Sequence, residues 1–329
     1  MSLASSASET IAAMKAAQKY LYQCGGPILM LIGTIGCMLN LIVFTQKALR
    51  KNPCSIYFIA YNVANFLYIY SSLLALTLSV GYSIDVSIYN LIICRLRLYT
   101  VSLFNTLSPF YLILASVDRI FVTSSNALTR QRSTRRFAYL CILIGTLFWA
   151  LFHSHALIAS NIRQLAPNAF LCYFQQGIHL VFVSYYAVIK ETSTLLLMII
   201  CGLWSVKNIR NIQHVRGVTN LSTSRTTTEG SSHSASSKDR QLIFMLLLDI
   251  IICASFSFAF AIFLMYQQIT QNYTKSSDQI QIENIVRNLC LFSAGIPFCT
   301  SCYANLIVSK TFRYEAKKAL SWKRIFCIH

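Results

Sequence analysis

The stretch that decides the fold runs from residue 91 to residue 122 and reads LIICRLRLYTVSLFNTLSPFYLILASVDRIFV. As a helix it is long and apolar enough to cross a bilayer, which takes about 20 residues. Cys94 stands near its beginning, and Arg119 stands near its end. At 1.5 Å per residue their separation is about 37 Å, so the two residues mark opposite faces of one membrane.

Six further apolar runs of spanning length accompany this one, and helices are expected because backbone groups in lipid must be paired within the segment. Charged residues make up only 12% of the 329 residues, against about 25% in soluble domains. This composition argues against a soluble helical protein. The expected fold is an all-α membrane bundle over residues 27–308. Its seven predicted spans are residues 27–46, 56–80, 91–122, 137–159, 177–206, 241–266 and 283–308.

The basic residues predict the orientation. Of 28 Lys and Arg residues, 20 lie in segments 47–55, 119–136, 207–240 and 310–329, which alternate with the other loops. The positive-inside rule assigns this side to the cytoplasm. Segment 1–26 is then extracellular and the C-terminus cytoplasmic, as in a multi-pass plasma-membrane protein. The net charge of +18 follows from this topology, so no nucleic-acid partner is expected.

Two segments on the predicted inner side stand apart. Within the loop 207–240, residues 219–237 include 12 Ser or Thr in 19 positions, a composition typical of disorder. In the tail 309–329, apolar residues recur at helical spacing after Lys310, which predicts an amphipathic helix on the membrane lipid surface. Cys327 is a palmitoylation candidate, with an unmodified thiol as the alternative.

The cysteines suggest one disulfide and no metal. Cys172 lies in the external loop between the fourth and fifth predicted spans, where an oxidising exterior favours a disulfide. Cys94 is the favoured partner, because this bond would tie the loop over the third helix; Cys24 and Cys290 remain alternatives. Most other cysteines lie in apolar segments without metal-ligand spacing, so neither a metal nor a cofactor is expected.

In these features the chain resembles the rhodopsin-like (class A) G-protein-coupled receptors over nearly its whole length. Cys94 followed by Asp118–Arg119–Ile120 is similar to that family's third-helix Cys and Asp-Arg-Tyr motif, and Gly36 to Asn40 resembles its first-helix Gly-x-x-x-Asn. The resemblance implies an external ligand and a heterotrimeric G protein inside. It implies helix-packing roles for Asn40, Asn65 and Trp149, and roles in G-protein coupling for Asp118, Arg119 and Tyr303. Phosphates on segment 219–237 would recruit a kinase-dependent, arrestin-like partner, unless that segment is an inert linker.

The chain also departs from that family. Asn65 stands where the second helix normally has Asp, Cys299–Thr300 replaces the Asn-Pro before Tyr303, and the fifth and sixth spans lack their prolines. These losses put a sodium site and ordinary activation in doubt. A receptor-like protein that no longer signals is one alternative. A membrane transporter is another, although neither a repeat nor Gly/Pro-interrupted spans are visible.

Two residues argue against two classes of ligand. Val101 stands where amine receptors carry Asp, and Ser293 where opsins carry the retinal-binding Lys, so neither ligand is expected. Charges inside spans are costly. We therefore expect Lys190 or Glu191 to line an external cavity, although adjacent residues, about 100° apart on a helix, should not face one neighbour. The alternative is a structural pair satisfied by neighbouring helices. The ligand-binding candidates are Arg97, Asn105, Lys190, Glu191 and Arg287.

A mixed-charge cavity favours a peptide ligand, and a resemblance to invertebrate neuropeptide receptors points the same way. Asn272–Tyr273–Thr274 is a glycosylation sequon in a predicted external loop. Asn220–Leu221–Ser222 also matches, but it should be cytoplasmic and unmodified. No enzyme is expected, because His153 and His155 are two residues apart and point to different sides of a helix.

Overall fold

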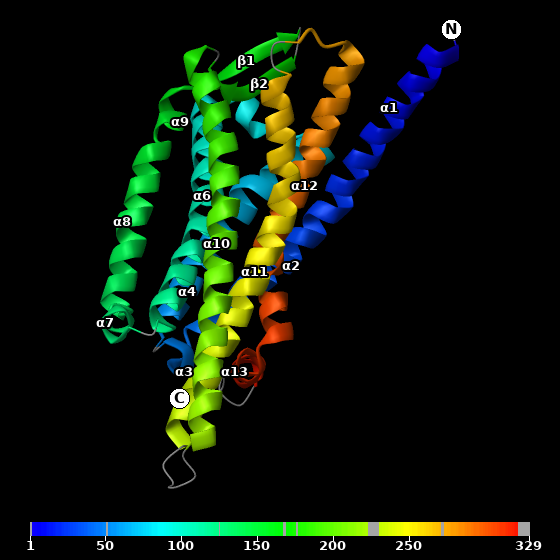
Figure 1. The fold of residues 1–329 in the computed structure, drawn as a ribbon. Coiled ribbons are helices and arrows are strands. Elements are labelled where there is room, and N and C mark those ends of the chain that lie inside the picture. Colours follow the sequence, from blue (N-terminus) through cyan, green and yellow to red (C-terminus); the bar gives the residue numbers. More distant parts are fainter. Residues whose placement is uncertain are drawn as a thin grey trace, which may run out of the picture.

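The computed structural model describes residues 2–50, 52–124, 126–166, 169–175, 177–222, 230–270 and 273–321. Within these ranges seven helices are long and apolar enough to span a membrane (Figure 1). The coarse prediction of a seven-span, all-α membrane bundle is therefore confirmed. The spans are Ser8–Phe44, Pro53–Gly81, Leu91–Val122, Arg135–Ile158, Ile178–Asn208, Gln241–Ile269 and Ser277–Val308.

The first two spans contain π-helical turns between α-helical parts. The first comprises α1 (Ser2–Tyr20), η1 (Leu21–Gly25) and α2 (Gly26–Phe44), and α3 (Lys47–Arg50) follows it. The second comprises α4 (Pro53–Tyr68), η2 (Ile69–Leu73), α5 (Leu74–Leu76) and η3 (Thr77–Gly81).

The other elements follow in order. They are η4 (Val86–Ile88), α6 (Leu91–Val122), α7 (Ala127–Gln131), α8 (Arg135–His153), α9 (His155–Ile158), β1 (Ser160–Ala166), β2 (Ala169–Phe174), α10 (Ile178–Ser222), α11 (Gly230–Ile269), α12 (Ser277–Val308) and α13 (Lys310–Leu320).

Helix caps explain where several spans begin. The Asn90 side chain accepts hydrogen bonds from the backbone at the start of α6, and Asn52 does the same for α4, with Pro53 at the first helical position. Ser276 and Gln279 form a capping box at α12. This box starts α12 six residues before the predicted span 283–308.

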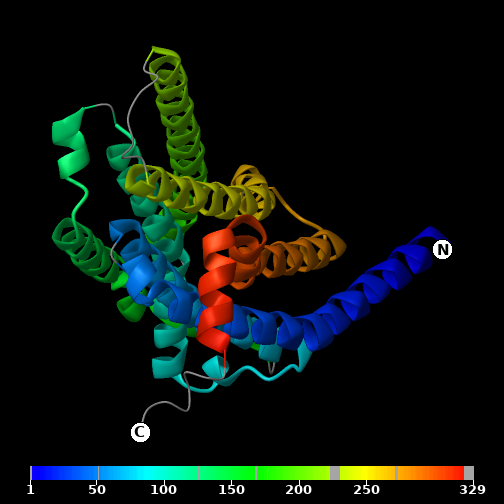
Figure 2. The same ribbon diagram turned by 90° about the horizontal axis from the view of Figure 1, so that it is seen from below.

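The N-terminal segment 1–26, predicted as an extracellular tail, contains helix from Ser2 onward. Its Ala, Lys and Gln residues are good helix formers, and extending an existing helix costs less than nucleating one. Figures 1 and 2 show α1 projecting away from the rest of the bundle as a continuation of α2.

The spanning helices pack against one another as a single bundle. Helix α2 packs against α4 and α12, α11 packs against α10 and α12, and α6 contacts α4, α8, α10 and α11 (Figure 2). Small residues allow some of these contacts: a Cβ added to Gly33 would meet Cys299 of α12, and one on Gly145 would meet Phe110 of α6. Packing at these two contacts therefore depends on glycine.

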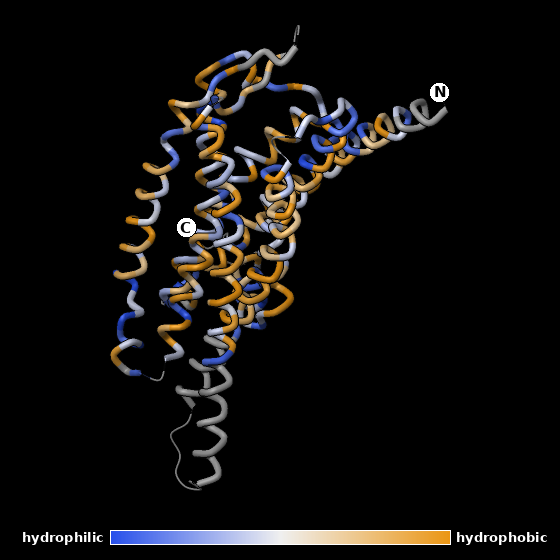
Figure 3. Tube along the Cα trace, turned by 45° about the horizontal axis from the view of Figure 1, so that its top comes forward, coloured by the Kyte–Doolittle hydropathy of each residue, from blue (hydrophilic) through white to orange (hydrophobic). Residues whose placement is uncertain are grey.

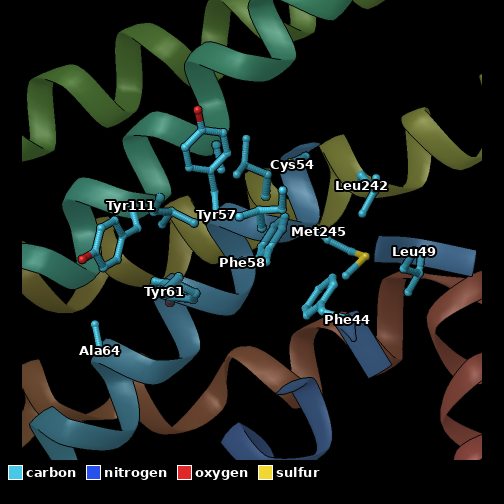
Figure 4. Packing of buried hydrophobic residues seen from close by; sticks show 14 of the residues in the cluster. Phe44, Leu49, Cys54, Tyr57, Phe58, Tyr61, Ala64, Tyr111, Leu242 and Met245 are labelled. Carbon is cyan, nitrogen blue, oxygen red and sulfur yellow. The ribbon is translucent and has the colours of Figure 1, made fainter. Parts of the chain in front are cut away.

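Apolar side chains occupy both the inside and the outside of the bundle. Figure 4 shows the buried cluster around Phe44, Phe58 and Met245. On α8 the large apolar residues Leu143 and Leu151 are exposed by 58% and 73%. Figure 3 shows hydrophobic residues along the helices and hydrophilic ones gathered near their ends. An outer surface of this kind suits lipid as the solvent.

The segment between α9 and α10 is an antiparallel hairpin of β1 and β2, at the top of Figure 1. Cys172 of β2 forms a disulfide with Cys94 of α6, the pairing that the sequence favoured over Cys24 and Cys290. Both of those alternatives are free thiols. The Arg95 guanidinium also donates to the Ser160 carbonyl oxygen, so α6 holds both strands.

The opposite end carries α13, which is seen end-on in Figure 1 while the bundle helices run down the view. Ser309 caps α13, and the side-chain oxygen Oε1 of Gln241 accepts hydrogen bonds from the Ser309 hydroxyl and the Thr311 backbone N–H. The buried Phe312 ring lies against Phe44 of α2. These contacts fix α13 to α2 and α11.

Parts of the predicted loop 207–240 are helical, since α10 extends to Ser222 and α11 begins at Gly230. The reason is that adding residues to a long helix is inexpensive compared with starting a new one. Residues 223–229 of the Ser/Thr-rich segment, the sequon residue Asn272 and the palmitoylation candidate Cys327 lie outside the described residues.

Candidate functional site

A cavity of about 260 Å³ lies inside the bundle beneath the hairpin. Tyr173 and Phe174 of β2 contribute to its wall, and the spans α4, α6, α8, α10, α11 and α12 supply most of the rest. The disulfide from α6 to Cys172 holds β2 in this position. The cavity is therefore enclosed by helices from nearly the whole chain and covered by a tethered strand.

Lys190 and Glu191 both line this cavity, as the sequence suggested for at least one of them. The Lys190 Nζ and Glu191 Oε1 atoms lie 2.5 Å apart, and the two residues are only 8% and 7% exposed. The sequence predicted that Lys190 and Glu191 would not face the same neighbouring residue. It did not consider that their side chains could pair with each other. Two long, flexible side chains bend toward each other despite the angle between their Cα–Cβ bonds.

Three of the five predicted ligand-binding residues meet at the cavity, since Asn105 of α6 lines it together with the ion pair. Arg97 and Arg287 are not among the described lining residues. The Arg97 guanidinium instead pairs with Asp85, at 3.0 Å from Oδ1, and donates to the Ser87 hydroxyl. Asp85 caps η4, so Arg97 fixes the turn that leads into α6.

His153 of α8 lines the cavity, although it was not among the predicted ligand-binding residues. Its Nδ1 lies 2.9 Å from the Trp149 carbonyl oxygen. Since a carbonyl only accepts, Nδ1 carries a proton, and in the neutral ring Nε2 accepts from the Tyr186 hydroxyl at 3.1 Å. Thr106 Oγ1 lies 3.4 Å from the same nitrogen. The imidazole thus links α6, α8 and α10 at the cavity wall.

The predicted packing residue Trp149 contributes mainly through its ring. Its indole meets Phe110 of α6 edge-on, with ring centroids 6.2 Å apart. Gly145 lies one turn earlier on α8 and leaves room for the same Phe110 ring. The contact between α6 and α8 therefore combines an aromatic pair with a glycine.

Asn40 and Asn65 are buried polar residues that join neighbouring helices. Asn40 donates to Asn62 of α4 at 2.6 Å and accepts from Asn305 of α12 at 3.3 Å. The side-chain oxygen Oδ1 of Asn65 accepts a hydrogen bond from the Ser108 hydroxyl of α6. Interhelical hydrogen bonds of this kind contribute to helix association in membranes. Both residues therefore lie at contacts between spans.

The buried charge pair at the α13 end of α6 contains Asp118 and Arg119. Arg119 Nη2 lies 2.6 Å from Asp118 Oδ2 and 2.8 Å from Asn52 Oδ1, and Arg119 is 1% exposed. The other Asp118 oxygen accepts from the Ser133 hydroxyl, which lies between α7 and α8. Removing one member of a buried pair leaves an uncompensated charge, which costs about 3–5 kcal/mol.

Tyr303 of α12 forms a hydrogen bond with the first span. Its hydroxyl donates to the Ile32 carbonyl oxygen of α2 at 3.1 Å. The resemblance implied a role for Tyr303 in G-protein coupling. In this structure its hydroxyl bonds to the first span.

Another buried carboxylate lies on α11, where Asp249 is 2% exposed and accepts a hydrogen bond from Ser301 of α12 at 3.1 Å. Asp249 is not among the described residues that line the cavity. It therefore joins the sixth and seventh spans, below the residues that face the cavity.

No protein-family model matches the chain, and no curated protein matches it either. Cys94, Asp118, Arg119 and Lys190 were accessible to sequence reasoning, because a charge or a cysteine in an apolar run is conspicuous. Tyr186, an aromatic in an aromatic-rich span, carries no such signal.

Proposed function

We propose that the chain is a rhodopsin-like receptor that transmits binding of an extracellular ligand to a heterotrimeric G protein. The observation that carries this proposal is that one helix, α6, reaches both sites. Asn105 lines the cavity, and Arg119 is held in a buried charge pair 14 residues later, about 21 Å along the helix. A displacement of α6 caused by a ligand would therefore act on Arg119 directly.

The proposed mechanism is a shift between two populations of the bundle. A ligand favours one arrangement only by as much as it binds that arrangement better. In the resting arrangement Asp118 and Asn52 hold the Arg119 guanidinium. In the signalling arrangement these bonds open and Arg119 meets the G protein. The hairpin end is then extracellular and the α13 end cytoplasmic, at the plasma membrane.

Further partners follow from the same orientation. The exposed basic residues Arg130 of α7 and Arg136 of α8 would face anionic lipid headgroups and an acidic G-protein surface. A kinase and an arrestin-like protein are proposed partners of segment 219–237. The ligand is external and neither an amine nor retinal, and a peptide is the class favoured by the sequence.

A seven-helix protein that no longer signals is the second candidate. The observation that favours it is the hydrogen bond from Tyr303 to Ile32, which occupies the tyrosine hydroxyl expected in coupling. A transporter is the third candidate, and the central α6, continuous from Leu91 to Val122, counts against it. Transporters place their sites at discontinuous helices.

The test measures G-protein dissociation in cells that express the chain, first unstimulated and then with a neuropeptide library. The native chain is compared with Arg119→Ala and Arg119→Lys at equal surface expression. We expect a response that is lost in Arg119→Ala and reduced in Arg119→Lys, since the ammonium of lysine lacks the planar fork of arginine. An equal response in all three proteins would refute the role of Arg119. Uptake of a solute without any G-protein response would favour the transporter.

A further inference from the structure

The cavity wall contains one balanced pair of charges. Among the described residues that line it, Lys190 and Glu191 are the only Lys, Arg, Asp or Glu. The remainder is neutral, with aromatic and aliphatic side chains, several hydroxyls, the Asn105 amide and the imidazoles of His153 and His155. The net charge of the wall at neutral pH is therefore set by an ion pair whose charges cancel.

Several groups without a fixed charge lie near this pair. Glu191 lies within electrostatic range of Tyr68 on α4, Tyr186 on α10 and Cys253 on α11. Lys190 lies within range of His153 on α8. A ligand with one charge would attract one member of the pair and leave the other buried without a counter-charge. Such a group is strongly disfavoured in a site of low polarity.

A ligand that carries both charges avoids this penalty. We propose that the cavity binds a small zwitterion, whose carboxylate takes Lys190 and whose ammonium takes Glu191. Because Nζ and Oε1 lie only 2.5 Å apart, the ligand's two groups must be close together, as they are in a free α-amino acid or a folded, unblocked dipeptide. This proposal rests on the receptor function proposed above only for the step from ligand binding to signalling.

The rest of the wall selects the body of this ligand. Phe260 and Leu264 of α11 and Phe298 of α12 line the cavity, so the part of the ligand away from the charges is apolar or aromatic. The volume of about 260 Å³ lies just below the usual range for small-molecule sites, roughly 300–1,000 Å³. It suits an amino acid or a dipeptide rather than a long peptide entering whole.

The experiment measures thermal unfolding of the purified full chain in detergent, with twenty L-amino acids and a set of apolar dipeptides as probes. Each active probe is compared with three analogues of the same body, as L-phenylalanine would be with N-acetyl-L-phenylalanine, L-phenylalaninamide and N-acetyl-L-phenylalaninamide. These carry a negative charge, a positive charge and no charge. We expect at least one zwitterion to raise the unfolding midpoint and its three analogues to have no effect.

Two variants separate the ion pair from general stability. In Lys190→Gln/Glu191→Gln the zwitterion should no longer raise the midpoint. The control is Lys275→Gln/Glu283→Gln, which removes another ion pair, 2.7 Å long, near the loop between α11 and α12. Neither of its residues lines the cavity, so this variant should keep the full ligand-induced shift.

Three results would overturn the proposal. They are no shift with any zwitterion, an equal shift with a blocked analogue, and a shift that survives in the cavity variant. Binding is read without a G protein, so its outcome is distinct from that of the proposed function. A zwitterion that binds without an Arg119-dependent response would sustain this proposal and refute the receptor role. An Arg119-dependent response to a blocked peptide would support the receptor role and refute the zwitterion proposal.

Discussion

Asn52 and Arg119 are joined by a hydrogen bond of 2.8 Å from the guanidinium to the side-chain oxygen Oδ1 of Asn52. The same oxygen accepts from the Cys54 backbone N–H and so caps α4. One amide therefore begins the second span and holds the arginine at the end of the third. A change at Asn52 should affect both the stability of α4 and the hold on Arg119.

Substituting Asn52 separates these two effects. In Asn52→Ala both bonds are lost, so we expect a loss of about 1 kcal/mol in stability together with raised basal G-protein dissociation. In Asn52→Asp the cap is retained, since Asp and Asn cap about equally well, and a second carboxylate faces Arg119. Basal dissociation should then fall below that of the native chain. If both variants shifted basal dissociation in the same direction, the hold on Arg119 would not involve Asn52.

The contact between Gly145 and Phe110 predicts a packing defect. A Cβ at position 145 would overlap the Phe110 ring, so Gly145→Ala should cost about 1–3 kcal/mol through overpacking. Gly202→Ala is the matched control, because its Cβ would meet Leu247 at an ordinary 3.4 Å. Alanine also favours a helix over glycine by roughly 1 kcal/mol. Thermal unfolding should therefore show a lower midpoint for the first variant and an equal or higher one for the second.

The disulfide between Cys94 and Cys172 should contribute substantially to stability. It closes a loop with a sequence separation of 78, for which the loop-entropy relation gives about 4.5 kcal/mol. In Cys94→Ser/Cys172→Ser the unfolding midpoint should fall, and a mild reductant should lower the midpoint of the native chain but not of this variant. A reductant effect of equal size in both proteins would locate the sensitive bond elsewhere.

The features that could be predicted from the sequence are those that differ in polarity or chemistry from the residues around them. Seven apolar runs, a lone cysteine in a long external loop, and acid–base residues inside apolar segments all contrast with their surroundings. Each of them has one favourable structure when it is placed in lipid or protein: an apolar run forms a helix, the cysteine forms a disulfide, and acid–base residues form an ion pair. Cys94 and Cys172 are joined for this reason, and Lys190 lines the cavity for this reason.

Contacts set by the rotation of one helix against another were not predictable. Arg97 was assigned to the cavity, but it pairs with Asp85 across a turn. His153 was dismissed, but it joins three helices through Thr106 and Tyr186. Apolar residues occupy both the lipid-facing and the inward faces of a span, so their periodicity does not fix which face turns inward. The partner of a polar side chain stays open until the helices are packed.

The orientation of the bundle gives a final prediction, which the two glycosylation sequons test. With the hairpin end outside, the loop after α11 is extracellular, so Asn272 should carry a glycan, while Asn220 near the end of α10 should not. In cells the native chain should migrate faster after treatment with an endoglycosidase. Asn272→Gln should abolish this shift, and the control Asn220→Gln should retain it. The opposite pattern would invert the topology, place Arg119 outside the cell, and so exclude its contact with a G protein.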